Sequence, residues 1–312
     1  MRIPAVPMSA ALTPLQKFVF LNVRMFAYAA TTPGLPLSVK TVSNGRVLYK
    51  LDSKEVAIDD DGYLIINNRQ PYTIEISSPT LAESFVVRFP DGWAEEVYRS
   101  TTAPADELLD APVDRTRRTF FPTYTRHEAN VSPRVAVLRR KFQAGQIPDD
   151  SWLEEQLRLL LYAMWKSERG LRRSVLRIAA LRATTRNEVW KRVSRARDYL
   201  HSRYSTAVTL SEAAAVACLS PFHFLRSFHA AFALTPHQYL TQCRVSRAKF
   251  LLERTDLSLT DVALDSGFAT SAAFSTIFGK ETGVSPRGWR RERRLVPPQN
   301  RKIRKELLRS RL

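Results

Sequence analysis

Apolar residues recur at helical spacing across residues 209–289, and the pattern is written there twice. The first copy reads TLSEAAAVACLSPFHFLRSFHAAFALTPHQYL, and the second reads SLTDVALDSGFATSAAFSTIFGKETGVSPRGW. Leu210 matches Leu259. After one extra residue in the second copy, Phe224 matches Phe274. An internal repeat of this kind predicts a duplicated helical module.

Each copy carries the signals of a short helix, a tight turn and a second helix. The pairs Thr209–Glu212 and Ser258–Asp261 have capping-box spacing. Ser220–Pro221 places an N-cap before a proline at the first helical position. In the second copy Gly267 lies at the turn. The pattern therefore predicts two helix-turn-helix units.

Two such units joined by a helix over about 236–253 resemble the DNA-binding domain of the AraC/XylS family of bacterial transcription regulators. The segments SPFHFLRSF, TPHQYL and GVSP carry the resemblance, which covers about residues 193–291. It requires two motifs, a fixed spacing and both closing Ser/Thr-Pro steps. The resemblance implies a regulator that binds promoter DNA and contacts RNA polymerase.

The second helix of each unit is expected to enter the DNA major groove. With Phe228 at the centre of the buried face, Arg226 lies almost opposite at 100° per residue. An arginine can bind guanine O6 and N7, and Phe222 can pack on a thymine methyl. His223 and His229 fit base reading as well as a surface or phosphate contact. The predicted contacts of the first recognition helix are Phe222, His223, Leu225, Arg226 and His229.

The same construction on the second copy leaves only small groups and one lysine on the exposed row. The predicted contacts there are Ser271, Ala272, Ser275, Thr276 and Lys280. The family often has an arginine or another long polar residue where this chain has Thr276. Phosphate contacts are predicted for Arg287, Arg290 and Arg291.

The first half of the chain has a different period. From Leu37 to Phe89 short β-branched segments alternate with turns, and Asn44–Gly45 and Asp61–Gly62 predict hairpins. Short strands at this spacing predict a sandwich or barrel. The resemblance implies a cupin-type barrel that binds a small effector; the other reading is a domain that dimerises or contacts other proteins. Polar-ligand contact and solvation both remain open for Arg69, Glu75 and Arg88.

Residues 90–133 are rich in turns and prolines and are predicted to be a loop in which Phe120, Phe121 and Tyr124 pack against the barrel. Helices follow, one over 135–143 and one opened by a capping box at Ser151–Glu154. The second helix carries an apolar stripe, which either packs on its own domain or pairs two subunits. Its members are Leu153, Leu157, Leu160, Leu161 and Met164.

The net charge of +18 lies in the second half: residues 1–135 hold 15 basic and 15 acidic residues, which leaves 33 and 15 for residues 136–312. Such a basic half is typical of a protein that binds a polyanion. Two cysteines without metal-ligand spacing fit a reducing compartment. With one histidine in the first half, no metal centre is expected. No apolar run reaches 18 residues and no signal peptide is apparent, so a cytoplasmic, nucleoid-associated protein without a membrane partner is expected.

The sequence thus predicts an α+β protein. The expected parts are a cupin-like effector-sensing barrel (1–133), a helical connector or dimerisation region (134–186), an all-helical DNA-binding domain (187–293) and a basic tail (294–312). The tail either grips phosphates or serves as a solubilising end. We expect a homodimeric, sequence-specific regulator of transcription, with no cofactor and no enzymatic activity. The alternative is an architectural nucleic-acid-binding protein without an effector.

Overall fold

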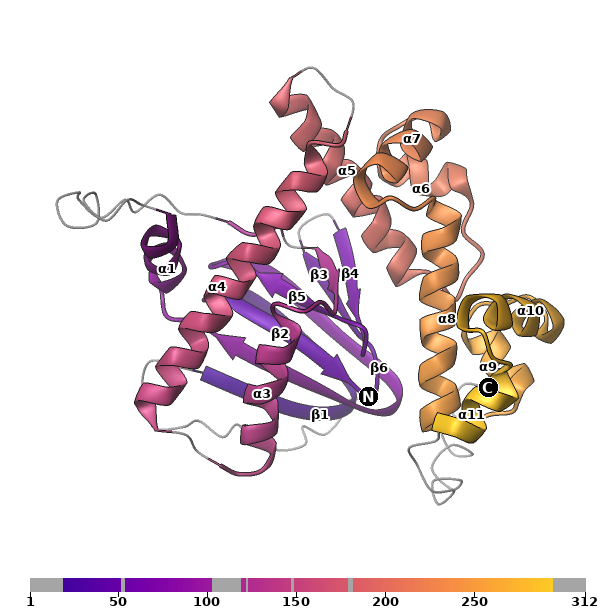
Figure 1. Cartoon of the computed structure of the whole chain (residues 1–312), viewed down its shortest axis with the longest axis horizontal. Helices are drawn as coiled ribbons and strands as arrows, with labels where there is room; N and C mark the ends of the chain where they lie inside the picture. The colour runs from indigo at the N-terminus through magenta and orange to yellow at the C-terminus, as the bar shows by residue number, and fades with distance from the viewer. Residues whose placement is uncertain are drawn as a thin grey trace. The chain divides into compact units, whose positions relative to one another are not determined.

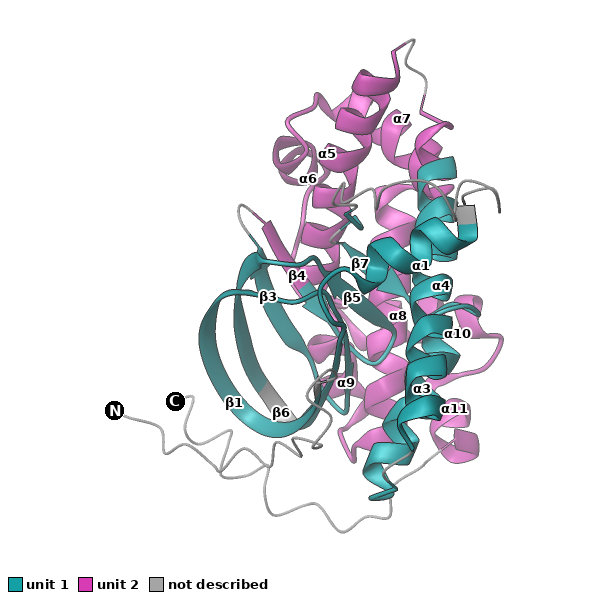
Figure 2. Ribbon diagram, turned by 90° about the vertical axis from the view of Figure 1, so that its left-hand side faces the viewer, with its two compact units in different colours: residues 1–53, 57–173 teal, residues 54–56, 174–312 magenta. Residues whose placement is uncertain are grey.

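The structure is a computed structural model that describes residues 19–51, 54–102, 119–121, 123–146, 149–178 and 182–293. Contacts divide the chain into two compact units (Figure 2). Unit 1 comprises residues 1–53 and 57–173, and unit 2 comprises residues 54–56 and 174–312. The predicted tail, 294–312, lies outside the described residues.

Unit 1 is built on a seven-stranded antiparallel sheet that curls into a nearly closed barrel (Figures 1 and 2). The strand order is β4-β3-β6-β2-β5-β7, and β1 pairs with β6. The strands are β1 (Val19–Leu35), β2 (Ser38–Ser43), β3 (Val47–Leu51), β4 (Lys54–Ile58), β5 (Gly62–Ile66), β6 (Gln70–Arg88) and β7 (Tyr124–Arg126). The predicted barrel is therefore confirmed.

The two predicted hairpins are wrong. Asn44 does turn the chain, with φ of 59°, but β2 and β3 on either side of it both pair with β6 and not with each other. The Asp61–Gly62 turn likewise joins β4 to β5, which are not neighbours in the sheet. The reason is β6, a 19-residue strand long enough to pair with β1 along one edge and with β2 and β3 along the other.

Helices α3 (Ser132–Gln143) and α4 (Asp150–Val175) lie along one face of this sheet (Figure 2). They share a hydrophobic core with sheet residues such as Val39 and Phe85. The apolar stripe of α4 lies in this core, and its five members, Leu153, Leu157, Leu160, Leu161 and Met164, are at most 1% exposed. The stripe is internal packing, because burial against its own sheet leaves it no surface for a second subunit.

Two local predictions in this region are corrected. Residues 90–133 are not all loop, since they contain helix α1 (Trp93–Thr102). Helix α4 is capped by Asp149, whose carboxylate accepts from the Trp152 N–H at 2.9 Å, and not by Ser151. The predicted packing of aromatic residues is confirmed for Phe120 and Tyr124, which are each 2% exposed.

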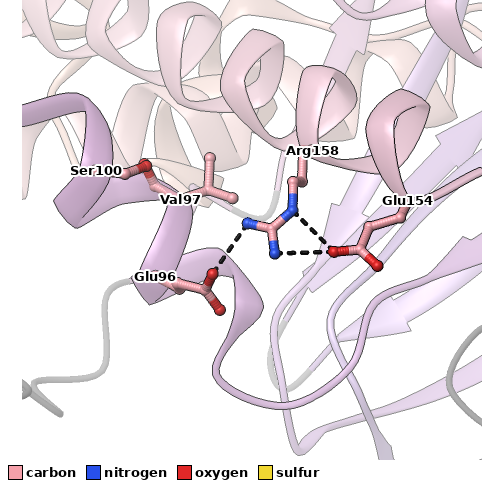
Figure 3. Close-up of polar contacts among 5 residues, drawn as sticks. All are labelled: Glu96, Val97, Ser100, Glu154 and Arg158. Carbon is pink, nitrogen blue, oxygen red and sulfur yellow. Dashed lines mark hydrogen bonds and ion pairs between the residues drawn. The ribbon is translucent and has the colours of Figure 1, made fainter. Parts of the chain in front are cut away.

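An arginine on α4 holds α1 in place (Figure 3). Arg158 Nη1 lies 2.9 Å from Glu96 Oε1 of α1, and Nη2 lies 3.0 Å from Glu154 Oε1 one turn earlier on α4. The guanidinium also lies 4.9 Å from the centre of the Trp93 ring. Exposed ion pairs stabilise by only about 0.2–1 kcal/mol, so this contact orients α1 more than it stabilises the unit.

Unit 2 holds a helical domain in which each predicted helix is found. Its helices are α5 (Ala183–Ser202), α6 (Leu210–Val216), α7 (Pro221–Phe232), α8 (Pro236–Arg254), α9 (Leu259–Asp265), α10 (Ser271–Thr282) and α11 (Pro286–Arg293). Helix α5 contacts α6, α7 and α8, while α8 contacts α9 and α11. The long helix α8 is therefore the element that connects the two helix-turn-helix units.

Candidate nucleic-acid interface

The first helix-turn-helix unit, α6 and α7, begins with the predicted capping box. The Glu212 N–H donates to Thr209 Oγ1 at 3.2 Å, and the Thr209 N–H donates to the Glu212 carboxylate at 2.7 Å. Ser220 then caps α7 by accepting from the His223 N–H. Both caps satisfy amide groups that have no partner inside the helix, which defines where each helix starts.

The second unit, α9 and α10, repeats this geometry with one difference at each cap. Ser258 accepts from the Asp261 N–H at 3.1 Å, without the reciprocal bond of a full capping box. Thr270 corresponds to Ser220 but lies one residue further beyond the preceding helix, and it caps α10 by accepting from the Ala273 N–H. The extra residue of the second copy therefore lies in the turn, and it leaves both recognition helices with a hydroxyl cap.

Cys218 and Gly267 occupy equivalent positions in the two turns. Both have left-handed backbone, with φ of 51° and 85°. In the second turn a Cβ on Gly267 would lie 2.4 Å from the carbonyl oxygen of Tyr204, so only glycine fits there. Cys218 is exposed and pays the steric cost that glycine avoids.

The buried faces of the two recognition helices match the prediction. Phe224 and Phe228 of α7 are fully buried, and so are Phe274 and Phe278 of α10. In α7 the two rings meet edge to face with centroids 5.4 Å apart, and in α10 the separation is 5.5 Å. These aromatic pairs fix the rotation of each helix, and so decide which residues face outward.

The exposed row of α7 contains the five predicted contact residues together. Phe222 is 70% exposed and Leu225 is 36% exposed. Arg226 lies one turn after Phe222, and its guanidinium carbon is 5.7 Å from the centre of the Phe222 ring. His223 and His229 are also exposed. The row therefore offers one cation, two imidazoles and two apolar groups to a partner.

The exposed row of α10 is chemically poorer. Ala272, Ser275, Thr276 and Lys280 are exposed, but the Thr276 hydroxyl donates to the Ala272 carbonyl at 3.1 Å. Ser271 is only partly exposed, and its hydroxyl donates to Thr260 Oγ1 at 3.3 Å. Two of the five predicted contacts are thus already engaged within the domain, and Lys280 is the charged group of this row.

The three predicted phosphate contacts all lie on α11, but they differ in how exposed their side chains are. Arg287 and Arg291 are exposed. Arg290 instead donates to the carbonyl oxygen of Leu257 at 2.6 Å, and burial lowers the pKa of its guanidinium. Its Nε is buried without a hydrogen-bond partner. Arg290 is therefore a structural residue that ties α11 to the segment before α9, because its donors point into the domain.

The sequence did not indicate that Arg244 of α8 connects this helix to the segment after α5. Its Nε donates to the Tyr204 carbonyl at 2.8 Å and its Nη2 donates to the Thr206 carbonyl at 3.1 Å, both just after α5 ends. Arg197 of α5 is only 9% exposed, and its guanidinium carbon lies 4.8 Å from the centre of the Phe232 ring. No local pattern marks either residue, because their partners lie some 35 or more positions away.

Two negative findings apply to the part of the chain that the structure describes. Its residues contain no group of three or more histidine, cysteine, aspartate or glutamate side chains that could hold a metal ion. None of the described helices is long and apolar enough to cross a membrane.

The helical domain is similar to known regulators. The family model described as "Helix-turn-helix domain" matches residues 213–292. The melibiose operon regulatory protein of Escherichia coli (strain K12) is 33% identical over 99 residues, which cover 32% of this chain and 33% of that protein. The chain carries a DNA-binding domain of the AraC/XylS family. The HTH-type transcriptional activator RhaR of Salmonella arizonae is 37% identical over 65 residues, or 21% of this chain and 23% of RhaR.

Solved structures are similar to parts of the chain or to most of it. The C-terminal domain of AraT, a response regulator from Geobacillus stearothermophilus, is 32% identical, with 35% of this chain and 92% of that chain covered and a TM-score of 0.33. Apo ToxT K231A from Vibrio cholerae is 10% identical, with 89% and 98% covered and a TM-score of 0.37. The chain spans about a third or less of the length of the curated AraC/XylS relatives described above.

Proposed function

We propose that this protein is a sequence-specific DNA-binding regulator of transcription. The observation that carries the proposal is the exposed row of α7, where Arg226 lies beside the 70% exposed Phe222 on a helix whose rotation two buried phenylalanines fix. Arginine and an apolar group are the side chains that read guanine and thymine in the major groove. The domain match to AraC/XylS regulators supports the same role.

Selection of the full chain against a random pool of duplex DNA tests this proposal. A regulator should enrich a defined site and bind it at least about 10³-fold more tightly than unrelated duplex at the same salt concentration. Uniform affinity for all duplexes would overturn the proposal. That outcome would support the architectural alternative, which the +18 net charge favours on electrostatic grounds.

The regulator is proposed to act as an activator through contact with RNA polymerase, and not through covalent chemistry. The relative RhaR is described as a transcriptional activator, and this supports the proposal. Such a protein acts in the cytoplasm, on the nucleoid. Transcription in vitro from a selected site, with purified bacterial RNA polymerase, should increase when the protein is added; unchanged or decreased transcription would contradict activation.

Pairing of two chains is also proposed, through β1 and not through the stripe of α4. Among the described strands β1 pairs only with β6, so no described strand covers the other edge of this 17-residue strand. Phe26 and Tyr28 of this strand are 40% and 38% exposed. The charge of Arg24 is neutralised by Glu83 at 3.1 Å, so a second β1 could approach without repulsion.

Sedimentation of the full chain tests the pairing. Changing Phe26 and Tyr28 together to serine should shift a dimer toward monomer. The matched control is Tyr162→Ser, because Tyr162 is 45% exposed but lies on α4. A monomeric wild-type protein, or a dimer that the β1 changes leave intact, would contradict the proposal.

A further inference from the structure

The first helix-turn-helix unit contains a hollow beside its recognition helix. The hollow has a volume of about 310 Å³ and is lined by residues from the end of α5, the start of α6, α7 and the start of α8. Its apolar lining includes Val208, Leu210, Ala213, Leu225 and Leu240. Leu210 and Leu225 are 42% and 36% exposed, so apolar side chains that line the hollow are in contact with water. Sites for small molecules start at roughly this volume.

The polar side chains of the lining are uncharged or already engaged. Thr209 Oγ1 accepts from the Glu212 N–H at 3.2 Å and donates to the Glu212 carboxylate at 2.9 Å. Thr235 Oγ1 accepts from the Gln238 N–H at 3.2 Å. His237 is the titratable side chain of the lining, and none of the described residues that line the hollow is a lysine, an arginine or a carboxylate. An ion would lose its hydration there without a fixed opposite charge, so the lining favours an uncharged molecule.

In the second copy of the repeat, one of the chain's own side chains spans the equivalent place. Leu240 of α8 corresponds to Arg290 of α11, and Val208 corresponds to Leu257, which precedes α9 as Val208 precedes α6. Arg290 Nη2 donates to the Leu257 carbonyl oxygen at 2.6 Å. In the first copy Leu240 is too short for this contact and has no donor, and both Leu240 and Val208 line the hollow.

The exposure of matching residues agrees with this difference. Leu257 is 3% exposed and belongs to the core of the second unit, whereas its counterpart Val208 is only partly buried. Leu259 packs against the same core, but its counterpart Leu210 is 42% exposed. The second unit therefore fills this place with Arg290, and the first unit leaves it open to a ligand.

We propose that this hollow binds a small, uncharged aromatic molecule, which packs against Leu210, Leu225 and Leu240. The inference goes beyond the proposed function, because it assigns a ligand to the DNA-binding domain itself. A cavity of about 150 Å³ lined by apolar side chains binds benzene, so a hollow about twice as large suits two fused rings. A rigid ring system also loses little conformational entropy when it binds.

Indole is the probe, because it is uncharged and has two fused rings, and indole-3-carboxylate is the charged control with the same rings. The full chain is labelled at its leucine methyl groups, and the resonances of Leu210, Leu225 and Leu240 are assigned by substitution. Indole should shift all three sets of methyl resonances through its ring current, with a Kd on the order of 1 mM or below. Indole-3-carboxylate should bind at least tenfold more weakly.

Variants decide whether indole occupies the hollow. Leu240→Arg introduces the residue type that the second copy has at this position, so it should fill the hollow and weaken indole binding at least tenfold. Ala213→Leu fills the hollow from α6 and should have the same effect, which keeps the test decisive if Leu240→Arg does not fold. The matched control is Leu264→Arg, which adds the same charge at a 56% exposed position of α9 and should leave indole binding unchanged.

Four results would overturn the proposal. The first is that indole at about five times the expected Kd leaves the three leucines unmoved. The second is that the filling variants bind indole as well as Leu264→Arg does, and the third is that the charged control binds as tightly as indole. The fourth is indole affinity that falls as protein concentration rises, which would mean that a second copy of the chain fills the hollow. None of these measurements involves DNA, so failure here is distinct from failure of the proposed DNA-binding function.

Discussion

The guanidinium carbon of Arg226 lies 5.7 Å from the centre of the Phe222 ring, one helical turn earlier on the exposed face of α7. The ring restricts the arginine to a smaller set of positions, which lowers the entropy lost when it binds. No comparable pair exists on the described exposed row of α10, where Thr276 uses its hydroxyl on the Ala272 carbonyl. The two recognition helices are therefore alike in fold and unequal in chemistry.

Substitution of Arg226 should alter sequence preference more than substitution of Thr276. Arg226→Ala removes the side chain for which we propose a bidentate guanine contact. A contact of that kind discriminates by about 1–3 kcal/mol, so the change should relax preference at that base pair. Thr276→Ala removes a hydroxyl that is already bonded internally and should change affinity only slightly. Binding to a selected site and to its single-base variants, at one salt concentration, measures both. Equal losses would contradict this asymmetry, and a uniform loss for Arg226→Ala would mark a phosphate contact.

Two phenylalanines of α7, Phe222 and Phe224, should have different effects when each is changed to alanine, the first on DNA binding and the second on stability. Phe222→Ala changes a 70% exposed side chain and should weaken DNA binding while leaving the free energy of unfolding almost unchanged. Phe224→Ala empties a fully buried position and should cost about 3–5 kcal/mol of stability. Urea denaturation and DNA binding of both variants separate the roles. A large loss of stability for Phe222→Ala would place that ring in the core.

Removing glycine from the second turn and adding it to the first turn should change the free energy of unfolding in opposite directions. Gly267→Ala brings a Cβ to 2.4 Å from the Tyr204 carbonyl in left-handed backbone, and should cost at least about 1–3 kcal/mol. Cys218→Gly relieves left-handed strain at an exposed site, and should add up to about 1 kcal/mol. Midpoints of urea denaturation report both changes. A stabilising Gly267→Ala would show that the turn rearranges.

Removal of the buried amine of Lys40 should stabilise unit 1 in a pH-dependent manner. The pKa of Lys40 is lowered from 10.5 to about 7, so the unfolded chain binds more protons between these values and burial opposes folding most below about pH 7. The stability gained by Lys40→Met should therefore be largest near pH 6 and should shrink as pH rises toward 10. Denaturation at several pH values, with Lys50→Met as the control, measures it. A gain that is constant with pH would mean that Lys40 titrates normally.

A charge in the stripe of α4 should unfold unit 1 and not release folded monomers. Leu157 is fully buried among residues of its own core, so Leu157→Asp buries an unpaired carboxylate there. We expect loss of the cooperative unfolding transition in circular dichroism. Leu153 and Met164 line the same core and should behave alike. A folded, monomeric Leu157→Asp protein would restore the stripe as a subunit contact.

The helical domain could be predicted closely because its signals are local. Caps such as Thr209 and Ser220 act over three residues, and the buried faces of α7 and α10 follow from the helical period alone. Even the inequality of the exposed rows is visible in the chain, since Arg226 and Thr276 occupy corresponding outward positions. The sequence repeat strengthened the prediction, because features that occur in both copies are those that the shared helix-turn-helix fold requires.

Tertiary structure decided whatever depends on partners distant in the chain. Only the strand order shows that the turns at Asn44 and Gly62 do not make hairpins, because β2 and β3 both pair with β6 and because β4 and β5 are not neighbours. The burial of Arg290 against Leu257, and of Lys40 beside Tyr72 and Arg88, likewise requires segments that fold together. From sequence alone, a polar side chain is predicted to be exposed to water. Its burial depends on all the segments that pack around it, and this gives no periodic signal along the chain.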